Sequence, residues 1–261
     1  MNWLDPHATL LALCAILLLA FAGWLLSVAR RDVSIVDSLW SLFFLCGALV
    51  YFAATSAPAP RAALVLSLVA IWALRLSGYL TWRNHGQPED HRYQAMRARN
   101  QPGFAWKSLY LVFGLQAVLA AIIGLPLYAA MSAVTTINAV DLIGFALWAV
   151  GFAFETIGDW QLARFKADPS SRGKVLQTGL WRYTRHPNYF GEAVLWWGYY
   201  LLAVAAGGWW TIFAPLLMTV LLLKVSGVAL LERDIGERRP GYRDYIARTN
   251  AFIPGRPKAK A

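Results

Sequence analysis

Seven long apolar segments constrain the fold of this 261-residue chain more than any other feature of its sequence. They cover residues 8–29, 33–55, 62–82, 108–131, 139–162, 190–206 and 209–231. A helix needs about 20 residues to cross a hydrocarbon core of about 30 Å. Only 15% of the residues are charged, against roughly 25% in soluble domains. The sequence therefore predicts an all-α integral membrane protein of seven transmembrane helices.

The distribution of the 24 Lys and Arg residues predicts the orientation in the membrane. They gather in the first, third and fifth loops and in the C-terminal tail, whereas the second loop holds only Arg61 and the fourth and sixth loops hold none. The positive-inside rule then places the N-terminus outside and the C-terminus in the cytoplasm. Topology and attraction to anionic lipid account for the net charge of +10, so no nucleic acid partner is expected.

The start of the chain predicts a retained first helix. Asp5 precedes the first apolar segment, and no basic stretch of the kind found in a signal peptide comes before it.

Residues 179–192, with the sequence GLWRYTRHPNYFGE, carry the densest polar motif beside a predicted span. Polar and ionisable groups at membrane depth are costly unless they face a cavity or bind something polar. Pro187 suits the first turn of a helix that restarts after His186, which puts Asn188 and Glu192 on one helix face. The motif therefore predicts a cofactor or substrate site, with a helix cap as the structural alternative for His186.

Acidic and basic residues precede this motif. Glu155 and Asp159 are four apart and share a helix face; this face could bind hydroxyl groups or pair with nearby arginines. Residues 164–185 hold six basic side chains, which suit a phosphate-bearing cofactor and equally suit cytoplasmic loop charge. There is no Rossmann or P-loop motif, and the four histidines have no ligand spacing, so no metal site is expected.

Asp37, Arg75 and Lys224 also lie inside predicted spans, where ionisable groups are functional candidates by default. Lys224 and Glu232 are eight apart and lie near one stripe of the last helix. Asp37 has Arg75 as its simplest partner, in a functional site or a structural ion pair.

Two polar stretches outside the spans complete the pattern. Residues 89–97 predict an amphipathic interfacial helix or a lid. Residues 237–254 mix arginines with aromatic residues, which suits packing over a planar phosphorylated ligand or lying on lipid headgroups.

Together these segments resemble the steroid 5α-reductase superfamily, and in particular its bacterial membrane proteins of unknown function. The resemblance implies a membrane reductase of the bacterial inner membrane, with NADPH bound at the cytoplasmic side. Its substrate would be an apolar, steroid- or lipid-like molecule with an activated alkene. One membrane domain would cover residues 1–256, with substrate-side helices in 1–107 and the cofactor part in 108–256, followed by a disordered tail at 257–261.

The resemblance also implies a set of cofactor contacts. Asp159 matches an acid that contacts adenosine or ribose, and Asn188 is expected at the nicotinamide amide. Glu155 stands at an Asn position, Lys224 at an Arg position and Glu232 at a Tyr position. The remaining expected contacts are basic or aromatic residues and one acid of the same motifs: Lys166, Arg172, Lys174, Tyr183, Arg185, His186, Tyr189, Glu192, Arg239, Tyr242 and Tyr245.

The catalytic residues follow the family less closely. The Gln-Glu pair that grips the substrate ketone in the animal enzymes is absent, and Asp37 is expected to replace its Glu. The implied reaction is hydride transfer to the β-carbon of an enone while a protonated Asp37 polarises the carbonyl, which requires burial to raise the pKa of Asp37. Tyr79 is a second candidate donor, and Arg75 completes the expected set as the partner of Asp37.

Two other classes stay open at this point. The core of the 179–192 motif also resembles isoprenylcysteine methyltransferases, membrane enzymes that use S-adenosylmethionine. That cofactor has no phosphate and would not need so many cations. A non-enzymatic lipid-binding protein or a transporter is the third class; transporters often show inverted repeats, and none stands out here. The sequence leaves the oligomeric state open.

Overall fold

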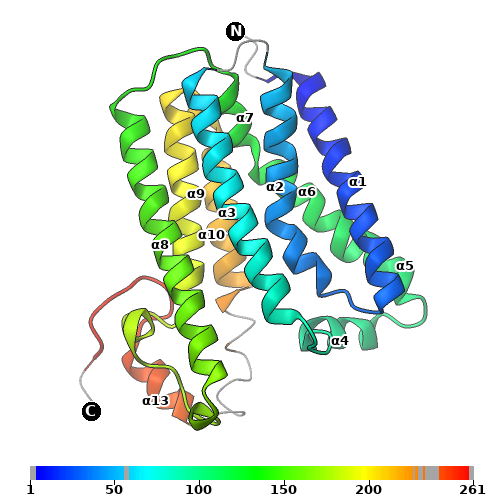
Figure 1. The fold of residues 1–261 in the computed structure, drawn as a ribbon, viewed down its shortest axis with the longest axis vertical. Helices are drawn as coiled ribbons and strands as arrows, with labels where there is room; N and C mark the ends of the chain where they lie inside the picture. Colours follow the sequence, from blue (N-terminus) through cyan, green and yellow to red (C-terminus); the bar gives the residue numbers. More distant parts are fainter. Residues whose placement is uncertain (1–3, 56–58, 226, 229–231, 233–240, 259–261) are drawn as a thin grey trace. The chain divides into compact units, whose positions relative to one another are not determined.

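The computed structural model describes residues 4–55, 59–225, 227–228, 232 and 241–258. All regular structure within these ranges is helical, as predicted (Figure 1).

Among the described residues, five helices are long and apolar enough to cross a membrane. They are α1 (Pro6–Arg30), α2 (Ile35–Ala54), α3 (Pro60–Asn84), the continuous helix Phe104–Ser132 and α8 (Ala139–Ala167). The fourth of these is built from α5 (Phe104–Ser108), the π-helical η1 (Leu109–Gly114), α6 (Leu115–Ile123) and α7 (Leu125–Ser132). The first five predicted spans are thus found as candidate membrane helices.

The sixth and seventh predicted spans correspond to weaker candidates. α9 (Pro187–Ala205) has 19 residues but is not among the five. η4 (Trp209–Ile212), α10 (Phe213–Val220) and η5 (Leu221–Val225) form a shorter apolar helix, Trp209–Val225. A total of seven spans, and the orientation, therefore stay predictions.

The chain contacts divide the protein into two compact units. The first comprises residues 1–138 and 202–211, and the second comprises residues 139–201 and 212–261. This partition does not decide the predicted division of function at residue 107, which stays a prediction.

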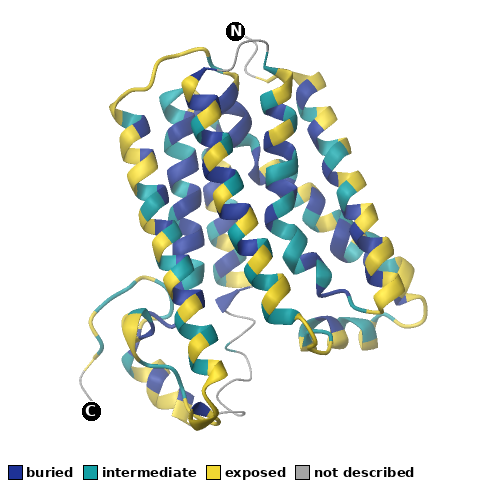
Figure 2. Ribbon diagram, in the orientation of Figure 1, coloured by how far each residue is buried: buried dark blue, intermediate teal, exposed yellow. Residues whose placement is uncertain are grey.

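In the first unit α2 packs against both α1 and α3, and α6 and α7 also contact it. The helix starts follow the sequence: Asp5 caps α1 by accepting a hydrogen bond from the amide of His7 at 2.9 Å, and proline occupies the first turn of α1 and α3. Large side chains fill the interior of this unit, among them Phe43, Trp72 and Phe113. Figure 2 shows the complementary exposed stripe along α1.

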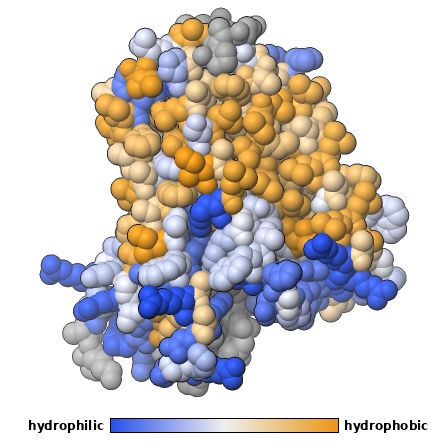
Figure 3. All heavy atoms as spheres, in the orientation of Figure 1, coloured by the Kyte–Doolittle hydropathy of each residue, from blue (hydrophilic) through white to orange (hydrophobic). Residues whose placement is uncertain are grey.

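The outer sides of these helices are apolar, as lipid-facing helices require. Leu10 is 60% exposed, Leu18 70% and Leu74 60%. Figure 3 shows hydrophobic residues along the sides of the first unit and hydrophilic residues at the end where α4 (His91–Arg99) lies. These features are compatible with an integral membrane protein.

In the second unit glycines allow α8 and α9 to approach closely. A Cβ atom at Gly198 would lie 2.6 Å from the backbone nitrogen of Trp148, and one at Gly151 would lie 2.6 Å from the carbonyl oxygen of Gly191. Small residues at a helix interface let two backbones come together. The spacing of these glycines therefore fixes the depth at which the polar residues of α8 and α9 meet.

Gly191→Ala is expected to lower the free energy of unfolding by about 1–3 kcal/mol, because overpacking at a rigid contact costs about that much. A Cβ at Gly191 would collide with the backbone of Glu155 and with Gly151. Gly78→Ala on α3 is the matched control, since a Cβ there meets nothing within 4 Å. Thermal unfolding in detergent should show a lower Tm for the first variant and an unchanged or higher Tm for the second. Equal effects would contradict the tight crossing.

Candidate functional site

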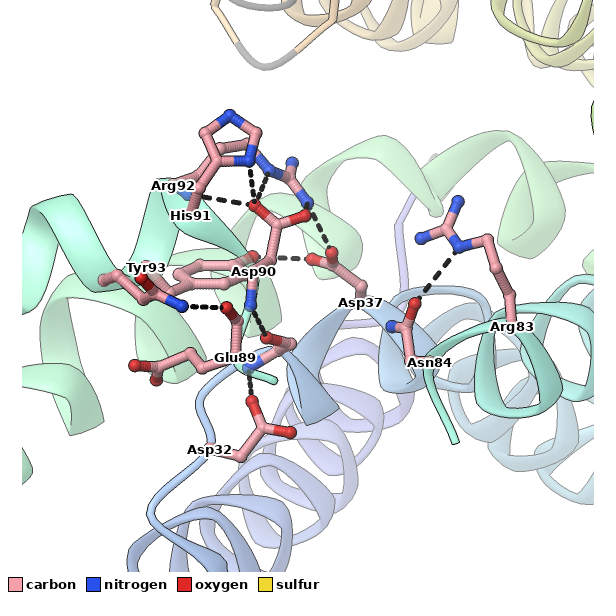
Figure 4. Close-up of polar contacts among 11 residues, drawn as sticks. Asp32, Asp37, Arg83, Asn84, Glu89, Asp90, His91, Arg92 and Tyr93 are labelled. Carbon is pink, nitrogen blue, oxygen red and sulfur yellow. Dashed lines mark hydrogen bonds and ion pairs between the residues drawn. The ribbon is translucent and has the colours of Figure 1, made fainter. Parts of the chain in front are cut away.

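Each unit contains a polar cluster, and the first is built around Asp37 in the first turn of α2 (Figure 4). The Tyr93 hydroxyl donates to Asp37 Oδ1 at 2.6 Å, and Arg92 Nη2 donates to Asp37 Oδ2 at 2.6 Å. Both partners come from α4, more than 50 residues along the chain. Asp37 thus has Arg92 and Tyr93 as partners, and its pairing with Arg75 stays a prediction. Asp37, Asp90, Arg92 and Tyr93 are called the Asp37 cluster below.

Capping and ion pairs fix α4 against the start of α2. Asp90 is the N-cap of α4 and accepts from the Arg92 amide and from Arg92 Nε, both at 2.9 Å. The Asp90 amide donates to the Ser34 hydroxyl at 2.7 Å. One residue earlier, Glu89 accepts from the Val33 amide at 2.9 Å and from Arg97 Nη2 at 2.7 Å.

The pKa values of these carboxyl groups follow from the same bonds. Burial alone would raise the pKa of Glu89, but the hydrogen bonds from Arg97 and Val33 outweigh burial and lower it. The pKa of Asp90 is likewise lowered, because the contacts with Arg92 outweigh burial. Within the stretch 89–97, where an interfacial helix or a lid was expected, the chain forms α4 at His91–Arg99. The ionised Glu89 and Asp90 before this helix hold it in place, and its role at the membrane interface or as a lid stays a prediction.

The geometry of the Asp37 cluster adds a residue to the expected catalytic set. Asp37 accepts one hydrogen bond from the Arg92 guanidinium and one from the Tyr93 hydroxyl. Burial and the neighbouring Asp37 raise the pKa of Tyr93, so the Tyr93 hydroxyl keeps its proton at neutral pH. Sequence reasoning missed Tyr93, although its stretch was singled out as polar.

The other two expected catalytic residues, Arg75 and Tyr79, lie one turn apart on α3, in the same unit as Asp37. Both are half-buried. The Arg83 guanidinium lies 5.8 Å from the centre of the Tyr79 ring. The catalytic roles of Asp37, Arg75 and Tyr79 stay predictions.

The second cluster lies on α8 and α9. Glu155 is 2% exposed, Asp159 4% and Glu192 8%. The Asn188 side-chain amide donates to Asp159 Oδ1 at 3.1 Å. The predicted shared face of Glu155 and Asp159 is found, and α9 begins at Pro187 as predicted. Because carboxylates are rarely buried without a specific purpose, this acidic face is a candidate site.

Exposed basic residues follow the acidic face directly at the end of α8. Arg164, Lys166, Arg172, Lys174 and Arg182 are all exposed. Helix geometry puts Lys166 about 10 Å along the axis from Asp159. This arrangement places cations beside buried acceptors.

The chain returns from the basic residues to α9 through η3 (Gly179–Arg182), which is tied to α8. The Leu180 amide donates to the Gln161 side chain at 3.0 Å. The Trp181 indole donates to the Gly158 carbonyl at 3.1 Å. These two bonds hold the 179–192 motif against α8.

Arg185 links this motif to the C-terminal segment. Its Nε and Nη2 donate to the two carboxylate oxygens of Glu232 at 2.6 and 2.8 Å. Its Nη1 donates to the carbonyls of Ile246 and Thr249, and its amide donates to the Asn250 carbonyl at 2.9 Å. Arg185 is only 7% exposed. Arg185 and Glu232 together with His186 are called the Arg185 clamp below.

His186 completes the clamp. Its Nε2 lies 2.9 Å from Glu232 Oε1, and its ring stacks on Tyr189 with centroids 5.6 Å apart. Burial would raise the pKa of Glu232, but the bonds from His186 and Arg185 outweigh it and lower that pKa to about 2. The clamp therefore holds an ionised carboxylate in a mostly buried position.

The C-terminal helix α13 (Gly241–Arg248) is fastened to the same motif. The Tyr245 hydroxyl donates to the carbonyls of Trp181 and Thr184. Tyr242 lies beside it, with ring centroids 5.4 Å apart. The Lys258 amide donates to the Arg248 carbonyl at 2.9 Å.

The remaining expected cofactor residues differ in how far they are exposed. Tyr183 is 43% exposed, and Lys224 is exposed on η5. Arg239 lies outside the residues that the structure describes. The roles of all these residues as cofactor contacts stay predictions, and the bonds above give Arg185, Glu232 and Tyr245 a structural task in addition.

The comparisons with known proteins define the family. Residues 23–249 match the family described as "Protein of unknown function (DUF1295)". Because this match covers most of the chain, the protein belongs to that family. No solved structure matches the chain at a significant level.

Two curated proteins are similar to this chain. The uncharacterized protein C594.04c of Schizosaccharomyces pombe is 28% identical over 268 residues, which cover 88% of this chain and 75% of that protein. Mouse 3-oxo-5-alpha-steroid 4-dehydrogenase 1 is 39% identical over 57 residues, 22% of each chain. The second match supports the relation to the steroid 5α-reductase superfamily and suggests a membrane reductase-like protein; the bacterial branch stays a prediction.

Proposed function

We propose that this protein is a membrane-embedded reductase that uses NADPH to reduce an activated C=C bond of an apolar, steroid- or lipid-like substrate. The observation that carries the proposal is the acidic face of α8 and α9 with the exposed cations beside it. The distant similarity to the mouse steroid dehydrogenase supports it. The cofactor side would face the cytoplasm of a bacterial inner membrane.

The donor set of the second unit fits NADPH chemically. Buried carboxylates such as Asp159 and Glu155 can accept hydrogen bonds from ribose hydroxyls or an amino group. Asn188 has both a donor and an acceptor, as recognition of a nicotinamide amide requires. The exposed cations from Arg164 to Arg182 can pair with phosphates. Lys166 and its neighbours would also favour the extra phosphate of NADPH over NADH.

When bound, NADPH would supply the hydride, and the chain's own residues would bind and polarise the substrate. In the first unit the Tyr93 hydroxyl keeps its proton and is oriented by Asp37. Its one proton is donated to Asp37 in this structure, so Tyr93 would have to exchange that bond for one to a substrate carbonyl oxygen, where negative charge develops as an enolate forms. One such donor is typically worth about 3–4 kcal/mol in the transition state. Tyr79 is the alternative donor.

Thermal stabilisation of the detergent-purified protein by NADPH, NADH and S-adenosylmethionine tests the proposal. We expect NADPH to raise the apparent stability by about 2.7 kcal/mol at a hundredfold excess over its dissociation constant, and S-adenosylmethionine to have no effect. Ser67→Ala, an exposed substitution on α3, should respond like the wild type. Stabilisation by S-adenosylmethionine alone would support the methyltransferase alternative. No response to any ligand would support the non-enzymatic lipid-binding alternative.

A further inference from the structure

A pocket lined by several polar side chains lies in the first unit, at the end opposite to α4. Asp5 stands at the start of α1, and Tyr51 lies in the last turn of α2, whereas α4 packs at the start of α2. The pocket has a volume of about 280 Å³ and is also lined by Thr55, Tyr128 and Ser132. Neither the Asp37 cluster nor the acidic face contributes to it.

The Tyr51 hydroxyl indicates that the pocket can bind a ligand. Tyr51 as a whole is 4% exposed, and within the described part of the chain no side chain or backbone group bonds to its hydroxyl. The hydroxyl is not among the fully buried polar atoms that lack a partner, so it opens into the pocket that Tyr51 lines. Tyr128 lies at an edge-to-face angle of 70°, with its ring centroid 5.3 Å away. The Tyr128 hydroxyl accepts a hydrogen bond from the Asp5 amide at 2.7 Å, and its own proton can serve a ligand.

The charges around the pocket favour a cation. Asp5 Oδ1 caps α1 and accepts from the amides of His7 and Ala8, which leaves the second carboxylate oxygen for a ligand. Two helices, α2 and α7, end at the pocket with Ala54 and Ser132, and helix C-termini carry partial negative charge. The N-terminus of α1 also lies there, and Asp5 caps its partial positive charge. Of the described residues that line the pocket, none is Lys, Arg or His.

The side chains that line the pocket and its position at the helix ends indicate which kind of cation it can bind. Tyrosine ring faces attract ammonium groups, and an ammonium can also donate three hydrogen bonds. The carboxylate of Asp5 and the hydroxyl of Tyr51 are suitable acceptors for two of them. The pocket opens at the ends of apolar helices, where Leu10 and Leu11 are exposed along α1 and Val134 is 79% exposed. The pocket therefore lies at the level of lipid headgroups.

We propose that this pocket binds a primary alkylammonium group, supplied by the headgroup of an ethanolamine phospholipid or by a free amine. Asp5 provides the counter-charge, Tyr51 accepts a hydrogen bond, and Tyr51 and Tyr128 provide the aromatic walls. The proposal is independent of the reductase function and of the residues assigned to it.

Binding to the detergent-purified full chain tests the proposal. Short-chain phosphatidylethanolamine, phosphatidylglycerol with the same chains and free ethanolamine are titrated separately by native mass spectrometry and thermal shift. We expect the ethanolamine lipid to bind and the glycerol lipid not to bind. Free ethanolamine that binds as tightly as the lipid would identify a soluble amine as the occupant. Equal binding of the glycerol lipid, or no binding of either amine, would overturn the proposal.

Three variants locate the binding. Asp5→Asn keeps a good helix cap but removes the charge, and we expect amine affinity to fall about 10- to 100-fold, the usual range for a hydrogen bond to a charged group. Thr9→Ala, which removes a hydroxyl bonded to the Asp5 carbonyl, should bind like the wild type. Tyr51→Phe removes one oxygen and should weaken binding several-fold without unfolding the protein. Unchanged affinity in Tyr51→Phe and Asp5→Asn would overturn the proposal.

Discussion

Replacing Arg185 by methionine is expected to lower the free energy of unfolding by about 3–5 kcal/mol, the cost of breaking a buried ion pair by removing one partner. Methionine fills a similar length of space but leaves the Glu232 carboxylate without its guanidinium. The carbonyls of Ile246 and Thr249 lose a donor at the same time. The C-terminal segment should therefore detach from the 179–192 motif.

Thermal unfolding and limited proteolysis of residues 241–258 measure this effect. Arg243→Met on the exposed side of α13 is the matched control, and surface substitutions of this kind usually change stability by less than about 0.5 kcal/mol. If both variants were equally stable and equally resistant to protease, the Arg185 clamp would not hold the segment.

The clamp should also show a defined dependence on pH. The pKa of Glu232 is lowered from 4.5 to about 2 in the folded protein. Its contribution is therefore fully present above pH 4.5 and is lost as the pH falls towards 2. Arg185→Met removes part of that contribution, so the variant should lose less stability than the wild type in this window.

The apolar segments and helix starts could be predicted from the sequence because both depend on local chemistry. Runs of apolar residues gave the first five spans, and Pro187 marked the start of α9. The spacing of Glu155 and Asp159 likewise placed them on one face. The helix 104–132 begins four residues before the predicted span at 108, with Gly103 in a left-handed conformation at its N-cap.

The partners of the ionisable residues could not be predicted in the same way. Asp37 meets Arg92 and Tyr93 through a separation of more than 50 residues, and nothing in the local spacing specifies this contact. Arg75 was chosen because it was the other ionisable group in an early span. The folding of α4 back onto α2, fixed by Glu89 and Asp90, brings Arg92 and Tyr93 to Asp37.

The Arg185 clamp illustrates the same limit in the second unit. The family resemblance implied its members as cofactor contacts. The structure shows that Arg185 and Tyr245 also hold carbonyl groups of distant segments. A carbonyl carries no sequence signal, so a bond to one is invisible until the chain is folded.

Asp159→Asn is expected to weaken NADPH binding about 10- to 100-fold, the usual range for a lost hydrogen bond to a charged group. The substitution retains an oxygen that can accept from the Asn188 amide, so the local packing is kept. The substitution removes the charged carboxylate that would accept a hydrogen bond from a ribose hydroxyl or an amino group of NADPH. The effect should therefore appear in the dissociation constant for NADPH, with the Tm of the unliganded protein nearly unchanged.

Asp168→Asn is the matched control for this prediction. Asp168 lies nine residues further along, is fully exposed and caps η2 by accepting from the Ser170 amide, a task that asparagine performs about as well. Both substitutions remove one negative charge close to the exposed cations, so a purely electrostatic effect on a phosphorylated ligand would raise affinity in both. Lower affinity in Asp159→Asn alone would indicate direct contact with the cofactor. A rise in affinity in both variants would contradict the assignment of Asp159 and leave only the basic residues as a binding surface.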